Sequence, residues 1–234
     1  MDSNGLECEF QVHICTWVNA SGTDANQIGH RHYSDCAVML KNLSRMTAAR
    51  FSLPFLVLSV LTTTQGQVIH FGKCPPVTVA NNFFPPLYLG MWYEIAAYPN
   101  FVEIGSTCAA VRYTAVGGTA MQLNNTETRR DKSVLAVTGV AIPPDANVLA
   151  KYTLTVPQFP KPLPYWILGT DYRNFAVVYS CTFTGFFHSE LVWIISRSPT
   201  LSATYKSMAL NVLATNGIAT HPLRDAVQTD CKNY

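Results

Sequence analysis

Eight short segments that are typical of β-strands, separated by turn signals, constrain the fold of this chain more than any other feature. Gly117-Gly118 marks a hairpin between two of them, and Pro143-Pro144-Asp145 turns the chain before the next one. Several short strands at such spacing predict an all-β sandwich or barrel. The predicted strands span residues 92–98, 108–114, 119–126, 133–142, 149–156, 165–170, 175–182 and 191–196.

Two proline-rich segments and one helix complete the predicted secondary structure. Residues 74–86 predict an extended lead-in that is neither strand nor helix, followed by a short turn over residues 87–90. Residues 158–164 predict a loop, because proline cannot donate the hydrogen bonds of a sheet. After the last strand, Ser198-Pro199 predicts the start of an amphipathic helix and Gly217 its end. We expect this helix to pack against the outside of the β structure.

The composition fits a globular protein with a large apolar interior. Hydrophobic residues make up 48% of the chain and charged residues only 13%, which is about half of the usual share. Sixteen Lys and Arg residues against fourteen Asp and Glu residues leave a formal net charge of +2, and no basic run occurs. This pattern argues against a nucleic-acid partner.

A segment typical of a secretory signal peptide lies inside the chain rather than at its beginning. Met46 opens it, residues 51–61 are apolar, and Thr64-Gln65-Gly66 has the form of a cleavage site. We therefore predict a signal peptide over residues 46–66. The apolar stretch is short for a bilayer span, so a membrane anchor is the weaker interpretation.

This segment divides the chain into an upstream part and one domain. We do not expect residues 1–45 in the mature protein; a disordered extension and an internal signal-anchor are the alternatives. Residues 67–234 are predicted to form a single domain that is secreted and extracellular.

The seven cysteines divide in the same way. Cys8, Cys15 and Cys36 lie upstream, and together with His30 and His32 they lack the spacing of zinc ligands, so the sequence predicts no metal site. Four cysteines remain in the predicted domain, and an even number in a secreted domain implies two disulfides. The sequence alone allows three pairings of four cysteines. They are Cys74, Cys108, Cys181 and Cys231.

Three motifs give the chain a family resemblance. They are Gly90-Met91-Trp92-Tyr93-Glu94, Tyr165-Trp166-Ile167-Leu168-Gly169-Thr170-Asp171-Tyr172 and Trp193-Ile194-Ile195-Ser196-Arg197. Each is common alone, but in this order and spacing they resemble the signature of the lipocalins. The resemblance covers roughly residues 70–234 and extends in particular to apolipoprotein D and the insect bilin-binding lipocalins. It implies an eight-stranded antiparallel up-and-down β-barrel with one C-terminal α-helix packed outside, carrying a small apolar molecule.

The resemblance also implies structural roles for the motif residues. Trp92 would plug the closed end of the barrel, with Arg197 over its indole ring as a cation–π partner. The family pairing of cysteines would join Cys74 to Cys181 and Cys108 to Cys231. The full set of signature residues is Gly90, Trp92, Thr170, Asp171, Tyr172 and Arg197.

The candidate ligand site follows partly from alternation and partly from the resemblance. If Trp92 points inward, strand alternation predicts that Glu94, Ala96 and Tyr98 do so too. The inward Trp of the last strand in this family places Leu191, Trp193 and Ile195 inside, and similarity to the bilin carriers adds residues of the third and fourth strands. The predicted ligand-binding residues are Glu94, Tyr98, Asn124, Thr126, Leu135, Val137, Leu191 and Trp193. Alternatively some of them only fill the core.

Glu94 is the most informative of these candidates, because a carboxylate inside a barrel is costly unless it is paired. It would meet a polar group of the ligand or a water molecule, or else reach Arg112. Asn124-Asn125-Thr126 is also an N-glycosylation sequon, which conflicts with an inward Asn124.

The resemblance leaves two ligand classes and one enzymatic alternative. Bilin carriers place a His where this chain has Thr126, which favours a lipid, sterol or fatty acid over a bilin. A prostaglandin isomerase of the family uses an unpaired Cys, but disulfides would consume all four cysteines here. His70, His188 and His221 lack catalytic partners at motif spacing, so we predict a carrier without a cofactor rather than an enzyme.

Apolar residues in the loops predicted at the open end of the barrel point to a further partner. Several bulky side chains converging on one rim usually mark an interaction surface, so transient contact with a membrane or lipoprotein is expected of a monomer or weak oligomer. The alternative is that these rings fold inward and cap the cavity. The residues are Phe101, Val102, Phe159, Leu163, Tyr165, Phe183, Phe186 and Phe187.

Overall fold

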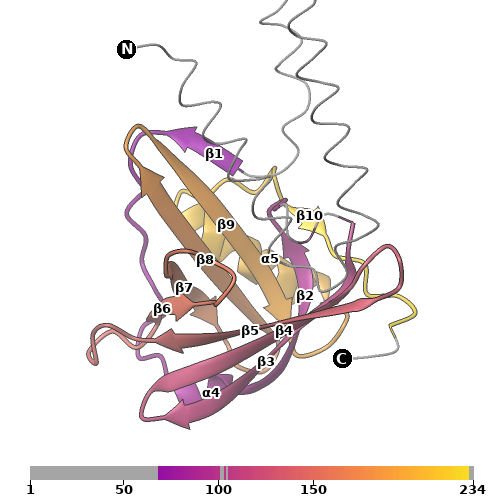
Figure 1. Cartoon of the computed structure of the whole chain (residues 1–234). Coiled ribbons are helices and arrows are strands. Elements are labelled where there is room, and N and C mark those ends of the chain that lie inside the picture. Colours follow the sequence, from indigo (N-terminus) through magenta and orange to yellow (C-terminus); the bar gives the residue numbers. More distant parts are fainter. Residues whose placement is uncertain (1–67, 101–102, 104, 232–234) are drawn as a thin grey trace, which may run out of the picture. The chain divides into compact units, whose positions relative to one another are not determined.

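A closed antiparallel β-barrel dominates the computed structural model, which describes residues 68–100, 103 and 105–231 (Figure 1). Neighbouring strands follow the order β1-β9-β8-β7-β6-β5-β4-β3-β2-β10, and an additional pairing of β9 with β2 closes the eight strands β2 to β9 into the barrel. The strands are β1 (Val68–Phe71), β2 (Gly90–Ala97), β3 (Thr107–Gly117), β4 (Ala120–Thr128), β5 (Val134–Ile142), β6 (Lys151–Thr155), β7 (Leu163–Thr170), β8 (Phe175–Thr184), β9 (Phe187–Ser196) and β10 (Arg224–Asp225). The predicted up-and-down barrel is thereby confirmed.

The helices and the chain ends differ from the prediction. The short helix α4 (Pro85–Tyr88) lies where we expected extended chain, because its two prolines occupy the first turn, where no backbone N–H is needed. Helix α5 (Ala203–Thr215) begins with Ser202 as its N-cap, later than Ser198-Pro199 predicted, and Gly217 follows it at a φ of 68°. The short edge strands β1 and β10 were not predicted.

Strand β7 begins earlier than expected. The sequence predicts a loop for Leu163 and Pro164, yet both lie in β7, with Pro164 opposite Thr153 of β6. The proline stands next to the first residue of the strand, where a missing donor interrupts the ladder least.

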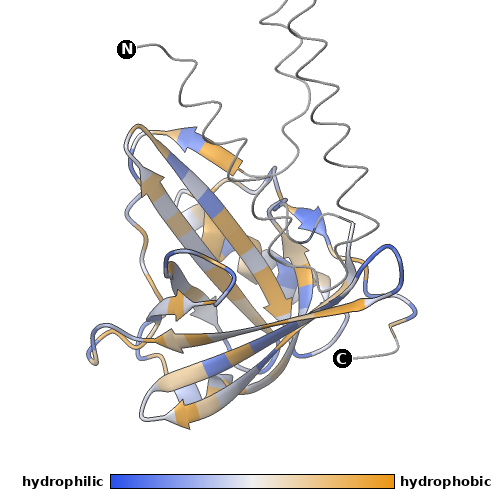
Figure 2. Ribbon diagram, viewed as in Figure 1, coloured by the Kyte–Doolittle hydropathy of each residue, from blue (hydrophilic) through white to orange (hydrophobic). Residues whose placement is uncertain are grey.

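Two apolar clusters occupy the two faces of the barrel wall. One fills the interior around Trp92, Tyr113 and Leu123. The other lies between the outer face of the wall and α5, which contacts β7 and β8 and buries Ala209 and Leu213 (Figure 1). Figure 2 shows apolar and polar residues succeeding one another along β9, as expected of a strand whose side chains alternate between two faces. The expectation that the helix packs outside the barrel is confirmed.

Both disulfides of the family pairing are present. Cys74 is bonded to Cys181 and Cys108 to Cys231, closing loops with sequence separations of 107 and 123 residues. Chain-entropy models put cross-links of this length at roughly 4–5 kcal/mol of stability. Such bridges are consistent with secretion.

Within the described residues, no helix is both long and apolar enough to span a membrane.

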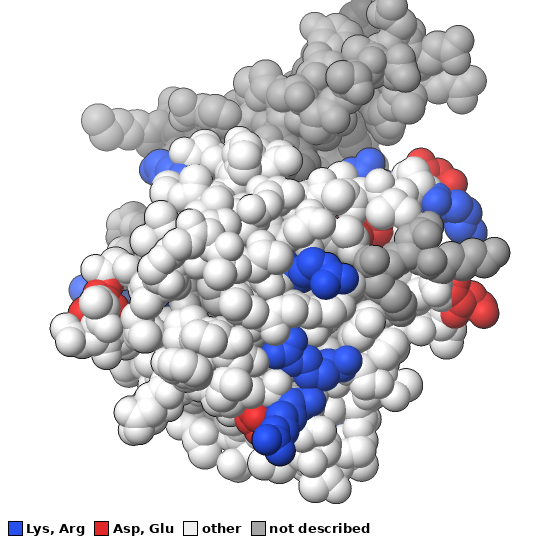
Figure 3. Space-filling model, turned by 90° about the horizontal axis from the view of Figure 1, so that it is seen from below, with Lys and Arg blue, Asp and Glu red and all other residues white. Residues whose placement is uncertain are grey.

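Trp92 and Arg197 close one end of the barrel. Trp92 is fully buried, and the guanidinium carbon of Arg197 lies 3.9 Å from the centroid of its ring. The same guanidinium donates hydrogen bonds to the backbone carbonyls of Leu87, Met91 and Tyr172, which fixes it in place. Viewed from this end, the surface is mostly uncharged, and Lys and Arg side chains gather near its middle (Figure 3).

The turn between β7 and β8 lies at the same end. A carboxylate oxygen of Asp171 accepts hydrogen bonds from the backbone N–H groups of Arg173, Asn174 and Phe175. The Thr170 hydroxyl donates to the Phe175 carbonyl, and Tyr172 adopts the left-handed region with a φ of 65°. These polar side chains therefore hold a tight turn.

Candidate ligand-binding site

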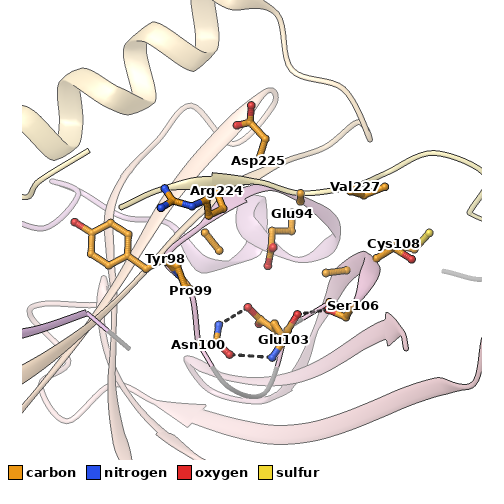
Figure 4. A pocket seen from close by; sticks show the side chains of 15 residues that line it. Glu94, Tyr98, Pro99, Asn100, Glu103, Ser106, Cys108, Arg224, Asp225 and Val227 are labelled. Carbon is orange, nitrogen blue, oxygen red and sulfur yellow. Dashed lines mark hydrogen bonds between the residues drawn. The ribbon is translucent and has the colours of Figure 1, made fainter. Parts of the chain in front are cut away.

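A pocket of about 380 Å³ lies toward the far end of β2 from Trp92 (Figure 4). Three segments contribute its walls: the end of β2 with the residues that follow it, the start of β3, and the chain around β10. Glu94, Ala97, Glu103, Ser106 and Val227 are among the lining residues.

A β-bulge in β2 decides which of its side chains reach the interior. Glu94 lies opposite Ile195, which belongs to the interior cluster, and the pairing then shifts so that Ala96 lies opposite Ile194 on the helix side. An extra residue on one strand reverses the alternation beyond it. Ala97 therefore takes the inward position, and the prediction that Ala96 points inward is wrong.

Tyr98 is displaced from the interior for the same reason. Its ring packs in the cluster beneath α5, and its hydroxyl donates to the carbonyl of Ala219. Tyr98 borders the pocket, but Figure 4 shows its ring directed away from Glu94. The prediction that this side chain lies inside the barrel is wrong.

The register of β4 and β5 corrects a second part of the predicted site. Residues directly opposite each other in an antiparallel pair share a face, so Val137 and Leu135, which lie opposite Asn125 and Glu127, face inward together with them. Asn125 and Glu127 were not predicted. The resemblance to the bilin carriers predicts the inward residues of β4 one position too early. A shift of one residue along a strand moves a side chain to the opposite face of the sheet.

Asn124 and Thr126 consequently lie on the outer face, where the predicted ligand contacts cannot form. Asn124 is opposite Thr138, whose hydroxyl donates to its side-chain oxygen at 3.2 Å. An outward Asn124 also removes the conflict with the glycosylation sequon, since a glycan needs an outer position.

Strand β9 places its predicted residues on the inner face. Leu191 and Trp193 alternate with residues of the outer cluster, and Trp193 packs against the interior cluster. Its indole lies 6.2 Å from the ring of Tyr165, whose hydroxyl is 2.5 Å from that of Tyr113. These rings form an aromatic wall of the barrel interior.

Three carboxyl groups meet beside this wall: Glu94, Glu103 and Glu127. Burial, and then the nearby charges of Glu103 and Glu127, raise the pKa of Glu94 well above its ordinary value of 4.5. Burial also raises the pKa of Glu103 and that of Glu127. A group of carboxyls in one low-dielectric site favours protonation of some of its members.

Glu103 was missed because it lies in a segment without predicted structure. Its carboxylate accepts hydrogen bonds from the side chains of Asn100 and Trp193, the latter at 3.4 Å, and its backbone N–H donates to Asn100. The hydroxyl of Ser106 donates to its carbonyl (Figure 4). No sequence signal identifies such a residue, because the loop brings it to the pocket.

Basic side chains around the pocket are engaged elsewhere. Arg112, the alternative partner for Glu94, lies on the outer face opposite Asn124. Arg224 donates to three backbone carbonyls of residues 221–223, and the Arg130 guanidinium packs against Gly105. Among the described residues, no salt bridge reaches Glu94, Glu103 or Glu127. The charge of Arg129 lowers the pKa of Glu127 against the effect of burial. The site therefore offers half-buried or buried carboxyl groups that have no salt bridge among the described residues.

Comparison with known proteins identifies the family of this chain. Residues 86–228, more than half of the chain, match the Lipocalin-like domain family. The chain belongs to the lipocalin family. Apolipoprotein D of Mus musculus is 38% identical to this lipocalin over 178 residues, covering 75% of this chain and 93% of the relative. The bilin-binding protein of Pieris brassicae is 30% identical over 164 residues, covering 68% and 85%.

Solved structures agree with this assignment. Insecticyanin of the tobacco hornworm Manduca sexta has a TM-score of 0.62 and 27% identity to this lipocalin, over 70% of this chain and 91% of that one. Lobster apocrustacyanin A1, at 23% identity and a TM-score of 0.63, covers 72% and 94% and supports the fold alone. The family and its relatives support the function of a carrier for a small hydrophobic ligand.

The apolar residues predicted at the open rim of the barrel fall into two groups, one inside the barrel and one on its surface. Tyr165 is buried inside the barrel and Phe159 packs against the interior cluster. These two rings therefore fold inward, which agrees with the alternative prediction that the apolar rings cap the cavity. Phe101 and Val102 lie outside the described residues. Phe183, Phe186 and Phe187 are exposed, and β1 adds exposed apolar side chains beside them. We call the resulting surface the rim patch: Ile69, Phe71, Phe183, Phe186 and Phe187.

Proposed function

We propose that this lipocalin carries a small amphiphilic lipid, with the apolar part inside the barrel and the polar end beside Glu94 and Glu103. The observation that supports this most is the position of two half-buried carboxyl groups, Glu94 and Glu103, without a salt bridge and next to the aromatic wall at Trp193. An apolar cavity with a few placed polar groups is the usual form of a small-molecule site. A sterol or a similar lipid whose polar end donates a hydrogen bond meets both requirements, whereas the carboxylate of a fatty acid would be repelled by ionised carboxyl groups.

A bilin is the alternative ligand, and the similarity to a bilin-binding protein favours it. Thr126 no longer separates the two ligand classes, since it lies on the outer face. Native purification followed by mass spectrometry of the organic extract identifies the ligand, and an absorbance scan of the same sample detects a bilin by its colour. A colourless protein with a stoichiometric lipid supports our proposal, whereas an extract without any organic ligand, together with failure to bind added lipids, contradicts it.

Trp193 provides a mutational test of the same proposal. Replacing Trp193 with Ala removes a large part of the wall, which should weaken lipid binding by on the order of 1–3 kcal/mol. Trp166→Ala is the matched control, because Trp166 packs in the outer cluster beside Lys151. If both folded variants bind a lipid as well as the original protein, Trp193 is core filler and the site is misplaced.

We further propose that the lipocalin is secreted without residues 1–66 and glycosylated at Asn124. The supporting features are the signal-like segment over residues 46–66, which lies outside the described residues, and the outer position of Asn124. N-terminal sequencing of secreted protein should find a start near Gln67, and glycosidase treatment should lower its mass. Peptides from residues 1–45 in that material would contradict the first part, and an unchanged mass the second.

We expect this site to bind and carry its ligand without catalysing a reaction. Cys108, the cysteine of the pocket wall, is bonded to Cys231, so it offers no thiolate for an isomerase of the kind that other lipocalins use. Assay of prostaglandin isomerisation by the purified protein tests this part of the proposal, and turnover above the uncatalysed rate would contradict it.

The rim patch supports transient contact with a lipid surface. Phe71 and Phe186 are 79% and 74% exposed, and the rings of Phe71 and Phe187 pack edge to face at 5.6 Å. Burying two Phe rings at a membrane interface would contribute roughly 3–6 kcal/mol before ordering costs, enough for reversible docking.

Liposome flotation of a Phe186→Ser, Phe187→Ser double variant tests this contact. The matched control is Val116→Ser, Ile142→Ser, which removes exposed apolar side chains at the closed end instead. We expect the first variant alone to lose flotation. Equal flotation of both variants, or none by the original protein, counts against the rim patch as a docking surface.

A further inference from the structure

A group of metal-ligating side chains lies on the outer face of the barrel, away from the pocket. Strand β1 pairs with β9 so that His70 stands directly opposite His188. Glu190 follows His188 by two residues and therefore projects from the same face of β9. The sequence separates His70 from the other two by more than a hundred residues, and only the pairing of β1 brings them together.

Both imidazoles approach the Glu190 carboxylate, and their stacked rings have centroids 5.3 Å apart. The Nε2 atom of His70 lies 3.5 Å from one carboxylate oxygen of Glu190, and the Nε2 atom of His188 lies 3.7 Å from the other. Both separations exceed an ordinary hydrogen bond, which is about 2.7–3.2 Å. Ligand atoms that share a tetrahedral zinc ion at roughly 2.0–2.2 Å each are about 3.3 Å apart.

Hydrogen bonds to the neighbouring groups orient these ligands. The Nδ1 atom of His188 lies 2.9 Å from the carbonyl oxygen of Gly72, and because a carbonyl only accepts, Nδ1 carries the proton. With Nδ1 at the Gly72 carbonyl, Nε2 is the ring atom of His188 that faces the Glu190 carboxylate. Tyr179 donates to Glu190 at 2.7 Å. Such outer hydrogen bonds are typical of metal-binding His and carboxylate groups.

Burial makes a compensating charge necessary and still leaves access. The side chains of Glu190 and His188 are only 5% and 8% exposed, whereas that of His70 is 42% exposed. A buried carboxylate is costly unless it is paired or coordinates a metal. Cys181 also lies near His188 and Glu190, but its sulfur is bonded to Cys74 and is no thiolate ligand.

We propose that His70, His188 and Glu190 bind one divalent transition-metal ion of the zinc type, which fastens β1 to β9. Two imidazole nitrogens and one carboxylate oxygen are a ligand set that zinc uses, and the exposed side of His70 leaves room for water as the fourth ligand. The site is separate from the lipid pocket, so neither proposal depends on the other.

Zinc binding by the metal-stripped full-length chain, with its disulfides intact and no reductant present, tests this site. Equilibrium dialysis with zinc alone should show one ion fewer for His70→Gln and for His188→Gln than for the original protein. His221→Gln is the matched control, because His221 is exposed and outside the group. Counting the difference between variants removes any contribution from the cysteines and histidines upstream of the described residues.

Tyr179→Phe separates a metal site from a simple ion-pair cluster. Removing the hydroxyl that orients Glu190 should keep the number of bound ions and weaken the affinity by about 10- to 100-fold. Zinc should also raise the unfolding temperature of the original protein and of His221→Gln, but not that of His70→Gln. If folded His70→Gln, His188→Gln and His221→Gln bind the same number of zinc ions with equal affinity, the proposal is overturned.

Discussion

At the closed end of the barrel, Arg197 donates to three backbone carbonyls and covers Trp92, and Asp171 accepts from three backbone N–H groups. At the open end, Glu94 and Glu103 are half-buried and Glu127 is buried, and no salt bridge among the described residues reaches them. Arg197 and Asp171 are paired within the protein, whereas the described residues place no basic partner on the carboxyl groups of the open end, although Glu103 accepts hydrogen bonds from Asn100 and Trp193. The first pattern builds a fold, and the second is what a binding site requires.

Replacing Trp92 at the closed end should give the largest effect. Trp92→Ala empties the centre of the interior cluster, and truncation of a fully buried Trp typically costs about 3–5 kcal/mol of unfolding free energy. Urea denaturation measures the loss. Trp166→Ala, at the partly buried outer position, should lower the unfolding free energy clearly less. An equal loss for the two variants would show that Trp92 contributes no more to stability than a partly buried tryptophan of the outer face.

Arg197→Ala tests the hydrogen bonds of the same end. The variant loses the cation–π contact and leaves three carbonyls without their donor, and we expect it to be about 2 kcal/mol less stable. Arg173 is the matched control, because its side chain is exposed at the neighbouring turn. If Arg173→Ala destabilises the protein as much, the loss reflects surface charge rather than the closure of the barrel.

Removing a charged group at the open end should stabilise the protein, whereas the substitutions at the closed end destabilise it. Glu94→Gln removes a half-buried carboxyl without a salt bridge, so above pH 4.5 the variant should be more stable, by about 1 kcal/mol. The pKa of Glu94 is raised in the folded state, so its stabilising contribution is complete below 4.5 and is lost as the pH rises through the folded value.

Urea denaturation of both proteins over a range of pH values measures this difference. The two proteins should be equally stable below pH 4.5 and diverge above it, with the original protein falling more steeply. A variant that is less stable at neutral pH would mean that Glu94 has a partner in the folded protein, and the contrast between the two ends would fail.

The closed end could be predicted from the sequence, whereas much of the open end could not. The motifs around Trp92, Asp171 and Arg197 serve the fold itself, so they keep a fixed spacing that a sequence displays. The strands were placed well because hydrophobic runs and turn residues mark them locally. Short elements such as β1 and α4 lack that length of pattern, and β1 escaped prediction although it brings His70 to His188.

Side-chain directions at the open end depended on single-residue events that a sequence does not mark. Strict alternation from Trp92 is correct as far as Glu94 and fails at Tyr98, because the bulge adds one residue between them. On β4 an error of one position exchanged Asn124 and Thr126 for their neighbours. Glu103 reaches the pocket from a loop, where no period exists to follow.

Tryptophan fluorescence during a lipid titration tests most directly whether the ligand lies at the open end. Trp193 borders Glu103 inside the barrel, and Trp166 packs on the outer face, so Trp193→Phe and Trp166→Phe form a matched pair. Our account predicts that the quenching caused by a bound lipid disappears in folded Trp193→Phe and persists in Trp166→Phe. Quenching that persists in Trp193→Phe and disappears in Trp166→Phe would place the ligand outside the barrel and contradict the account.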